Sequence, residues 1–374
     1  MVLSSLSVAK YFATLRDPRI NRRKLHRLLD IIVIAICAVI SGADDWQQIA
    51  TFAQRRHDWL KTFLALPNGV PSHDTFERVF DRLDPQAFLA CFQRWVEALT
   101  KGLGFKHVAI DGKTMRHSGN TVKGLGPLHL VSAWSTEYHL SLGQVAVDAK
   151  SNEITAIPQL LELLDVQGAL VTIDAMGCQK AIAKKVVDVG ADYALAVKDN
   201  QPHLRADIQA SITKALDEGR EGVEYEIYET EDKAHGRKET RSYLIMTDLS
   251  GIRNREDWAE LRVIGMYWST RGDEARYFIG SRQAGARVYG EAIRDHWGIE
   301  NNLHWQLDVT FGEDANRVQK RHGAENLALV RRLALSLLKR QSSKMSMACK
   351  RLSAALDTHF LEEILGTADK IGKR

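Results

Sequence analysis

Two short apolar runs that each end in an aspartate constrain the fold of this chain more than any other feature. One covers residues 108–111 and ends in Asp111, and the other covers residues 170–174 and ends in Asp174. Short apolar runs bounded by turn residues are typical of buried β-strands. If the two strands are parallel neighbours, the two aspartates stand side by side at the edge of a sheet.

The segments around these runs alternate between strand-like and helix-like patterns. Strands are predicted for residues 108–111, 128–135, 138–147, 169–174 and 193–197, and helices for residues 154–164 and 182–189. The resulting order is β-β-β-α-β-α-β. Three strands in series, followed by alternating helices and strands, indicate a mixed sheet covered by helices.

The flanking regions have different patterns. Residues 1–101 read as helices, and the apolar run 28–41 is too short to cross a bilayer, so we interpret it as a buried core helix. Residues 201–284 hold one helix and several β-like pieces, which indicate an insertion. A helix is predicted for residues 326–338, with Arg331 and Arg332 pointing away from its apolar face.

We therefore predict an α+β protein, in which an N-terminal helical domain precedes a mixed-sheet α/β domain that a β-rich insertion interrupts; the RNase H-like character of this domain is what the family resemblance described below implies. Its parts are a helical domain that binds DNA or is a plain bundle (1–101), the first part of the catalytic domain (102–200), the insertion (201–284), the second catalytic part (285–341) and a basic C-terminal tail (342–374).

Charge is unevenly distributed along the chain. The net charge is only +4, but residues 1–30 carry seven Lys or Arg against two Asp, and residues 331–374 carry ten against four acidic residues. Basic ends suit a polyanion, and the acidic middle suits bound cations. The four cysteines form no CxxC pair and no targeting signal is evident, which favours the cytoplasm.

A later stretch, residues 296–305, carries the third acidic candidate. Read as an α-helix, it places Glu300 on the same face as His296 and His304. Two aspartates and a glutamate offer hard oxygen ligands for Mg²⁺, and a pair of such ions can catalyse phosphodiester cleavage. A rival reading is a zinc site at His296 and His304, although their spacing differs from that of zinc proteases. Trp297 and Trp305 are interpreted as core anchors.

Several segments resemble one family when taken together in order. They are AIDGKTMRHS (109–118), LHLVSAWS (128–135), KSNEITAIPQLLELL (150–164), TIDAMGCQ (172–179), DYALAVKDNQ (192–201), HWGIENNLHWQLDVTFGED (296–314) and ENLALVRRLALSLLKR (325–340). They resemble the ISAs1 family of bacterial insertion-sequence transposases, which includes the H-repeat-associated proteins. The similarity extends over nearly the whole chain.

The resemblance implies an RNase H-like DDE catalytic domain in which Asp111, Asp174 and Glu300 are both the catalytic and the metal-binding residues. It implies Mg²⁺ as the cofactor, with Mn²⁺ as a substitute. The partners it implies are DNA, as transposon terminal inverted repeats and target DNA, and a second copy of the chain in a homodimer or larger assembly. The protein would act in the bacterial cytoplasm, on the nucleoid when bound to DNA, and not at a membrane.

The sequence departs from the Tyr-Arg-Glu-Lys signature of related enzymes, because His296 and Leu307 stand where that signature has arginine and lysine. Arg294 or a nearby lysine is a candidate substitute. The candidate DNA-contacting residues are Lys113, Lys198, Asn200, Gln201, Arg237, Lys238, Arg294 and His296.

Three functions remain open from the sequence. The first is an active transposase that nicks and joins DNA at transposon ends. The second is a catalytically inactive or domesticated descendant that only binds DNA. The third is a zinc hydrolase with a different substrate, which bound zinc at His296 and His304 would favour.

Overall fold

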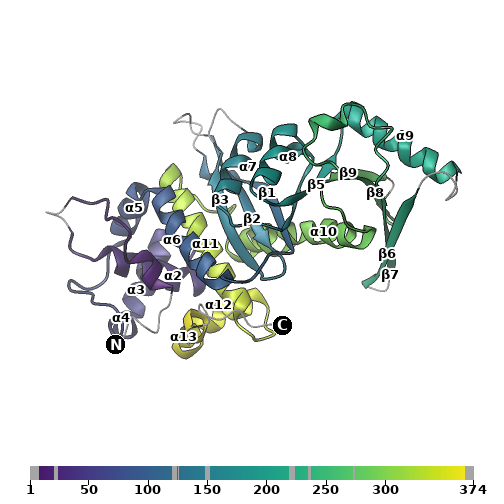
Figure 1. Cartoon of the computed structure of the whole chain (residues 1–374). Helices are drawn as coiled ribbons and strands as arrows, with labels where there is room; N and C mark the ends of the chain where they lie inside the picture. The colour runs from purple at the N-terminus through teal and green to yellow at the C-terminus, as the bar shows by residue number, and fades with distance from the viewer. Residues whose placement is uncertain are drawn as a thin grey trace.

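One nine-stranded mixed sheet runs through the molecule, with helices on both faces and a helical bundle at one end (Figure 1). The computed structural model describes residues 8–20, 24–119, 124, 126–147, 152–218, 224–234, 237–272 and 274–366. The strand order is β3-β2-β1-β4-β5-β9-β8-β7-β6. Within the described ranges, no helix is both long enough and apolar enough to cross a membrane.

The first five strands form the half of the sheet that carries both aspartates. They are β1 (His107–Met115), β2 (Leu128–Ser135), β3 (Leu140–Ala146), β4 (Leu170–Ile173) and β5 (Asp192–Val197). Strands β1 to β3 form an antiparallel meander, whereas β4 pairs in parallel with both β1 and β5. Helices α7 (Glu153–Glu162) and α8 (Lys180–Asp188) connect the parallel strands. The predicted order of elements and the RNase H-like mixed sheet are confirmed.

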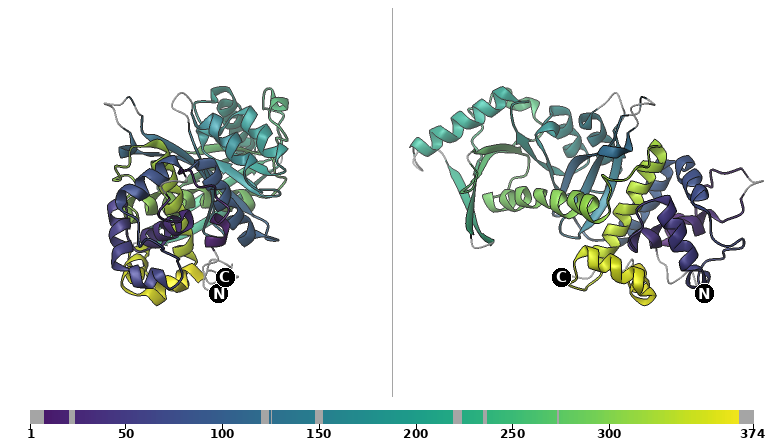
Figure 2. Two further views of the ribbon diagram at one scale, coloured as in Figure 1. Left: turned by 90° about the vertical axis from the view of Figure 1, so that its left-hand side faces the viewer. Right: turned by 180° about the vertical axis from the view of Figure 1, so that it is seen from behind.

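The region predicted as an insertion extends this same sheet. After α9 (Pro202–Glu218), it contributes β6 (Tyr225–Ala234), β7 (Arg237–Met246), β8 (Val263–Ser269) and β9 (Arg276–Gly280). Strand β9 pairs antiparallel with β5, and β8, β7 and β6 follow outward in turn. The β6–β7 hairpin therefore projects at the end of the molecule opposite the helical bundle (Figures 1 and 2).

The helical bundle forms around α2, nearly all of whose residues are buried. Its members are α1 (Ala9–Phe12), α2 (Leu28–Ile40), α3 (Trp46–Arg55), α4 (His57–Lys61), α5 (His73–Arg82) and α6 (Pro85–Thr100). A helix that is apolar on every side is buried on every side, as predicted for this run. The side chains of Asp45 and Asp84 cap α3 and α6, in line with the preference of aspartate for helix starts.

The last four helices tie the bundle to the sheet. They are α10 (Ala286–Ile299), α11 (Arg321–Arg340), α12 (Met347–Leu356) and α13 (Thr358–Gly366). Helix α11 packs on β2 and β3 and also on α2, α5 and α6, while α10 packs on β1, β4 and β5. Helices α7 and α8 lie on the opposite face of the sheet (Figure 1). The stretch predicted only as a basic tail holds α12, which packs against α2 and α11, and α13, which packs against α11 and α12.

One prediction about α11 is wrong. Arg331 and Arg332 do not point away from the core, because both side chains are completely buried. Each guanidinium has an acceptor: Arg331 donates to the carbonyl of the half-buried Asp44, and Arg332 pairs with the buried Glu313 carboxylate. The sheet covers one side of helix α11 and the bundle covers the other, so neither arginine lies on a solvent-exposed face of the helix.

Candidate active site

Asp111 and Asp174 follow neighbouring positions on two parallel strands. In the register of β1 and β4, Ile110 pairs with Ile173, and each aspartate is the next residue in its chain. Asp111 remains within β1, where it pairs with Ser132 of β2. The structure thus brings together the two aspartates that the sequence placed at strand ends.

Asp174 is held by the turn that it starts. Its Oδ1 accepts hydrogen bonds from the backbone amides of Met176 (3.1 Å) and Gly177 (3.3 Å). Two predicted DNA-contacting residues brace the same turn, because the Asn200 amide donates to the carbonyl of Ala175 (2.6 Å) and the Gln201 amide donates to that of Cys178 (2.9 Å). Asn200 and Gln201 therefore support the backbone beside Asp174.

Glu300 lies where the helix changes its winding. Helix α10 is α-helical up to Ile299, and the chain continues as two π-helical segments, Glu300–His304 and Gln306–Thr310. The prediction of an α-helix is confirmed up to Ile299 and wrong beyond it. A π-helix has wider turns than an α-helix and is often found at functional sites.

The three carboxylates influence one another, with Asp111 at the centre. Burial favours a raised pKa for Asp111, but a hydrogen bond and the charge of His304, whose Nδ1 lies 3.4 Å from Asp111 Oδ2, outweigh burial and lower this pKa. The pKa of Asp174 is raised by burial and by the negative charge of Asp111. Partial burial and the charge of Asp111 likewise raise the pKa of Glu300.

These groups have the chemistry of a site for a hard divalent cation. Mg²⁺ typically uses one or two protein carboxylates, with water and substrate phosphate as the remaining ligands, and Asp111 with Asp174 supplies that number. In the described part of the chain, no three His, Cys, Asp or Glu side chains lie close enough together to hold a metal ion. Glu300 is therefore coupled to Asp111 through charge without forming a three-ligand cluster with the two aspartates.

The zinc reading of the two histidines gains no support from their placement. His296 Nδ1 hydrogen-bonds with Thr172 Oγ1 at 2.8 Å, and His304 Nδ1 faces Asp111. A protein zinc site uses at least three side-chain ligands, and within the described residues no such group contains these histidines.

A buried row of polar groups lies behind the aspartates. Thr172 Oγ1 lies 2.7 Å from His107 Nε2 and hydrogen-bonds with His296 on its other side. Burial lowers the pKa of His107 to about 3 and also lowers that of His296. Both rings are therefore neutral near pH 7, and His296, a predicted DNA contact, is bonded to the sheet.

We expect His107 to make the fold sensitive to acid. Its pKa is about 3 in the folded protein, against about 6.5 in the unfolded chain, so the unfolded chain binds the extra proton between these values. Stability should therefore fall as the pH drops below about 6.5, by roughly 2 kcal/mol at pH 5 from this group alone. Urea unfolding of wild type and His107→Asn at pH 7 and pH 5 would measure this. Equal pH dependence in both proteins would contradict the assignment.

The basic candidates fall into two groups. Lys198 is exposed next to the site, and its charge acts on Glu300 together with that of Arg276 on β9. The others belong to the distal strands or face them: Lys238 pairs with Glu231 at 2.5 Å, and Arg294 pairs with Asp232 at 3.3 Å. The side chain of Arg237 lies outside the described residues, as do His235 and Gly236.

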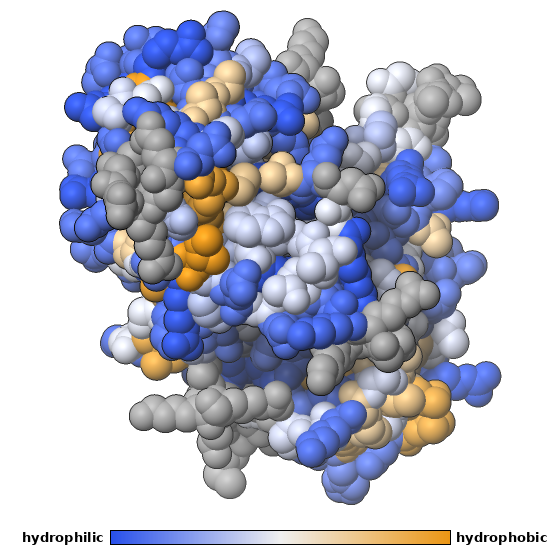
Figure 3. Space-filling model, turned by 90° about the vertical axis from the view of Figure 1, so that its right-hand side faces the viewer, coloured by the Kyte–Doolittle hydropathy of each residue, from blue (hydrophilic) through white to orange (hydrophobic). Residues whose placement is uncertain are grey.

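A pocket of about 400 Å³ separates the end of α10 from β7 and β8. Its lining includes Arg294, Trp297, Tyr267 and Arg276, and the Arg276 guanidinium lies 5.3 Å from the Trp297 ring centre. Figure 3 shows that this end of the molecule is mainly hydrophilic. Trp297 and Trp305 are 38% and 53% exposed, so the prediction that they are core anchors is wrong.

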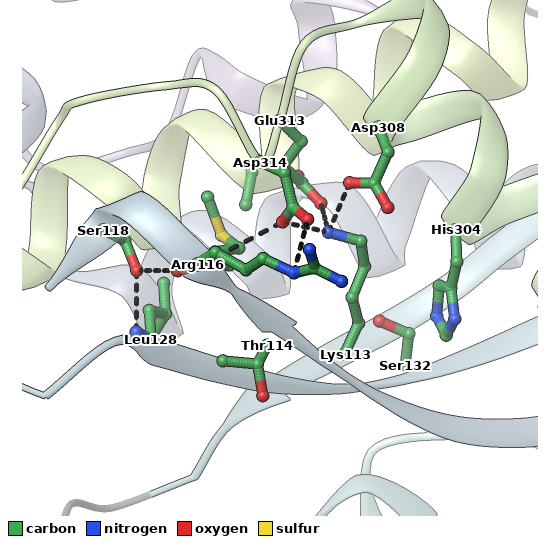
Figure 4. Close-up of polar contacts among 12 residues, drawn as sticks. Lys113, Thr114, Arg116, Ser118, Leu128, Ser132, His304, Asp308, Glu313 and Asp314 are labelled. Atoms are coloured by element: carbon green, nitrogen blue, oxygen red, sulfur yellow. Dashed lines mark hydrogen bonds and ion pairs between the residues drawn. The ribbon is translucent and has the colours of Figure 1, made fainter.

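Sequence reasoning missed several residues near the aspartates. Glu153 hydrogen-bonds with His129 at 2.7 Å and helps to raise the pKa of Asp174, yet no motif singles it out. Lys113, predicted to contact phosphate, is buried among carboxylates: its Nζ lies 2.6 Å from Asp308 and 3.1 Å from Asp314 (Figure 4). Those partners lie about two hundred positions away in the sequence, where no local pattern points to them.

The chain is similar to one family of known proteins over nearly its whole length. The family model described as "Transposase DDE domain" matches residues 102–337, and "DDE_Tnp_1-associated" matches residues 9–96. "Putative transposase YncI" of Escherichia coli O157:H7 is 39% identical over 383 residues, covering 100% of this chain and 97% of that protein. "H repeat-associated putative transposase YhhI" of Escherichia coli K12 is 36% identical, covering 95% of this chain and 97% of that protein. A solved piggyBac transposase synaptic complex with hairpin DNA aligns with a TM-score of 0.41 at 9% identity, over 96% of this chain and 78% of that one.

Proposed function

We propose that this chain, which belongs to the family of DDE-domain transposases, cleaves and joins DNA at the ends of an insertion sequence. Asp111, Asp174 and Glu300 would be its catalytic carboxylates. The observation that carries the proposal is the parallel register of β1 and β4, which sets two aspartates side by side, with Glu300 coupled by charge to one of them. The narrower placement in the ISAs1 group remains a prediction from the motifs.

The proposed cofactor is a divalent cation, Mg²⁺ or Mn²⁺, held by Asp111 and Asp174 with Glu300 as the third carboxylate. When bound as a pair, such ions supply activation of the attacking oxygen and stabilisation of the leaving oxygen in phosphodiester cleavage. The protein's part is to keep the ligands charged and in place. His304 keeps the Asp111 pKa low, and Asn200 with Gln201 fixes the turn after Asp174.

The proposed partner is DNA, first as the terminal inverted repeats and then as the target, bound by a homodimer or larger assembly in the bacterial cytoplasm. The charges of Lys198 and Arg276 already act on the Glu300 carboxylate, so these two cations are candidates to bind a phosphate there. Arg294 and Lys238, with Arg237, would contact DNA further out on the β6–β7 side. Arginine and aromatic side chains of the pocket beside α10 suit phosphates and bases.

Glu300→Gln tests the proposal. It keeps the size and hydrogen-bonding capacity of the side chain but removes the charge that a hard cation needs, so we expect nicking and joining with Mg²⁺ to fall by about 1,000-fold or more. The assay uses DNA with the repeats that flank the gene. Glu291→Gln, an exposed change on α10 that breaks only the pair with Arg287, is the matched control and should retain activity.

A second candidate function is a DNA-binding descendant without catalysis. It is favoured by one observation, that among the described residues the three carboxylates do not form a three-ligand group. Under this alternative, wild type binds the repeats but neither nicks nor joins them with Mg²⁺ or Mn²⁺. That result in the same assay would overturn the proposed activity.

A further inference from the structure

Lys113 is the centre of a second polar group, next to the catalytic carboxylates. This group, the Lys113 cluster, consists of Lys113, Asp308, Glu313 and Asp314 (Figure 4), together with Arg332, which pairs with Glu313. Lys113 Nζ lies 2.6 Å from Asp308, 3.1 Å from Asp314 and 3.4 Å from Glu313. Its side chain is only 8% exposed. A lysine this enclosed and this fully paired is held in one position.

The cluster belongs to a regular set of contacts between β1 and the Glu300-bearing helix. His304 contacts Asp111, and four residues later Asp308 contacts Lys113, two residues further along β1. The two contacts are two residues apart on the strand, which is about 7 Å, and four residues apart on the helical segment, so they form successive rungs between strand and helix.

A third contact fixes the other end of the same helix. His296, eight residues before His304, hydrogen-bonds with Thr172 of β4. Thr172 is the register partner of Ala109 on β1 and hydrogen-bonds with His107 as well. The helix therefore runs parallel to β1 over this whole length, and its register against the strand is defined at both ends.

Glu300 lies between these fixed points, one turn before His304. Its distance from Asp111 and Asp174 depends on the register of the helix along β1. A slip of one turn would move Glu300 by about 5.4 Å, which is more than enough to separate it from the other carboxylates. The risk of such a slip is greatest where winding is irregular, and the π-helical stretch begins at Glu300 itself.

We propose that Lys113 is a positioning residue, which binds Asp308 to fix the register of the Glu300-bearing segment along β1 and so sets the distance from Glu300 to the aspartate pair. The inference rests on the proposed function, because it concerns the same three carboxylates. It gives Lys113 a different task from the phosphate contact predicted from the sequence. Lys113 acts through Asp308 and does not touch the DNA.

The rest of the cluster provides a rigid base for this contact. Glu313 is completely buried and pairs with Arg332 at 3.1 Å, while Arg332 lies 3.4 Å from Ser132, the register partner of Asp111. Asp308 differs, because it belongs to the π-helical segment and its side chain is 33% exposed. The Lys113–Asp308 pair is thus the link between the fixed base and the segment that carries Glu300.

Lys113→Met tests the inference, with Arg116→Met as its matched control. Methionine keeps much of the length of lysine but cannot bind Asp308. Arg116 pairs with Asp314 of the same cluster at 3.4 Å, but its side chain is 80% exposed. Asp314 lies after the π-helical segment, which ends at Thr310. Both variants remove one positive charge beside Asp314, and the first alone frees Asp308.

We expect Lys113→Met to lower kcat for nicking by about 100-fold and to raise the Mn²⁺ concentration for half-maximal rate about tenfold. Affinity for repeat DNA should stay within about twofold, since Lys113 is not a DNA contact. Lys113→Arg, which keeps the charge, should recover most of the rate, and Arg116→Met should resemble wild type. Mn²⁺ binding to the DNA-free proteins, measured by calorimetry, should weaken in Lys113→Met alone.

The outcomes separate this inference from the function on which it rests. Suppose that wild type is active and that Lys113→Met melts at a lower temperature. If this variant, assayed below its melting temperature, keeps the wild-type kcat and Mn²⁺ requirement, Lys113 is merely structural and the inference fails. Selective loss of repeat-DNA affinity would restore the phosphate-contact role and also overturn it. If wild type cleaves nothing, the proposed function fails. The inference then stands only if wild type binds Mn²⁺ more tightly than Lys113→Met does, and absence of Mn²⁺ binding overturns both.

Discussion

Asp111→Asn is expected to abolish DNA nicking and joining, by about 1,000-fold or more, while binding of the terminal repeats stays within about twofold of wild type. Asp111 is the carboxylate whose charge reaches both Asp174 and Glu300. It is also the only one of the three whose pKa is lowered, so it is the one best suited to stay charged and bind a cation.

Loss of activity in this variant should come with only a small loss of stability. Asparagine keeps an oxygen to face His304 and ends the repulsion that raises the pKa of Asp174 and Glu300. The lowered pKa of Asp111, however, means that the folded protein favours its charged form on balance, and the variant loses that contribution. We therefore expect a melting temperature slightly below that of wild type, with the folded state still fully populated at the assay temperature.

The measurement combines a cleavage assay, a gel-shift assay and thermal unfolding on the same preparations. Asp199→Asn is the control, because Asp199 is exposed, directly precedes Asn200, which braces the turn after Asp174, and is paired with Arg205. An Asp111→Asn protein that still nicks at the wild-type rate would rule out the acidic triad as the source of activity. A protein that loses DNA binding to the same extent would show that Asp111 matters for binding instead.

The aspartate pair could be predicted because its determinants are local in the sequence. Each apolar run identifies a strand, and each aspartate is the residue at which that strand meets polar surroundings. The alternating helices then force the two strands to be parallel, so that Ile110 and Ile173 pair and the acids follow together. Glu300 was found from the motif that surrounds it, and residues 296–305 were read as a helix, although helix α10 begins earlier, at Ala286.

The remaining features depend on contacts between distant parts of the chain. Nothing near Lys113 indicates that Asp308 and Glu313 will surround it. The change to π-helical winding at Glu300 has no sequence signature, because residues 300–310 contain neither proline nor glycine. Arg331 and Arg332 look like surface residues of an amphipathic helix, but contacts with distant parts of the chain bury both: Arg331 donates to the carbonyl of Asp44, and Arg332 lies against Ser132 of β2 and Glu313.

Glu313→Gln is expected to destabilise the folded protein by about 3–5 kcal/mol, the typical cost of breaking a buried ion pair on one side only. Both Glu313 and Arg332 are completely buried, and their atoms lie 3.1 Å apart. Burial favours a raised pKa for Glu313, but the charges of Arg332, Lys113 and Arg331 outweigh it and lower this pKa, which shows how strongly the surroundings favour its charged form. Glutamine would leave the buried Arg332 charge without compensation.

Urea unfolding of Glu313→Gln beside two other variants would measure this cost. Asp188→Asn breaks the exposed pair with Lys184 on α8 and should be close to neutral, since exposed pairs contribute little. The double variant Glu313→Leu with Arg332→Met removes both charges, and we expect it to be more stable than Glu313→Gln, because an apolar pair leaves no buried charge unpaired. If Glu313→Gln is as stable as Asp188→Asn, the Glu313–Arg332 pair is not the anchor of the Lys113 cluster. In that case the base on which Lys113 positions Glu300 must lie in Asp314 and the loop that carries it.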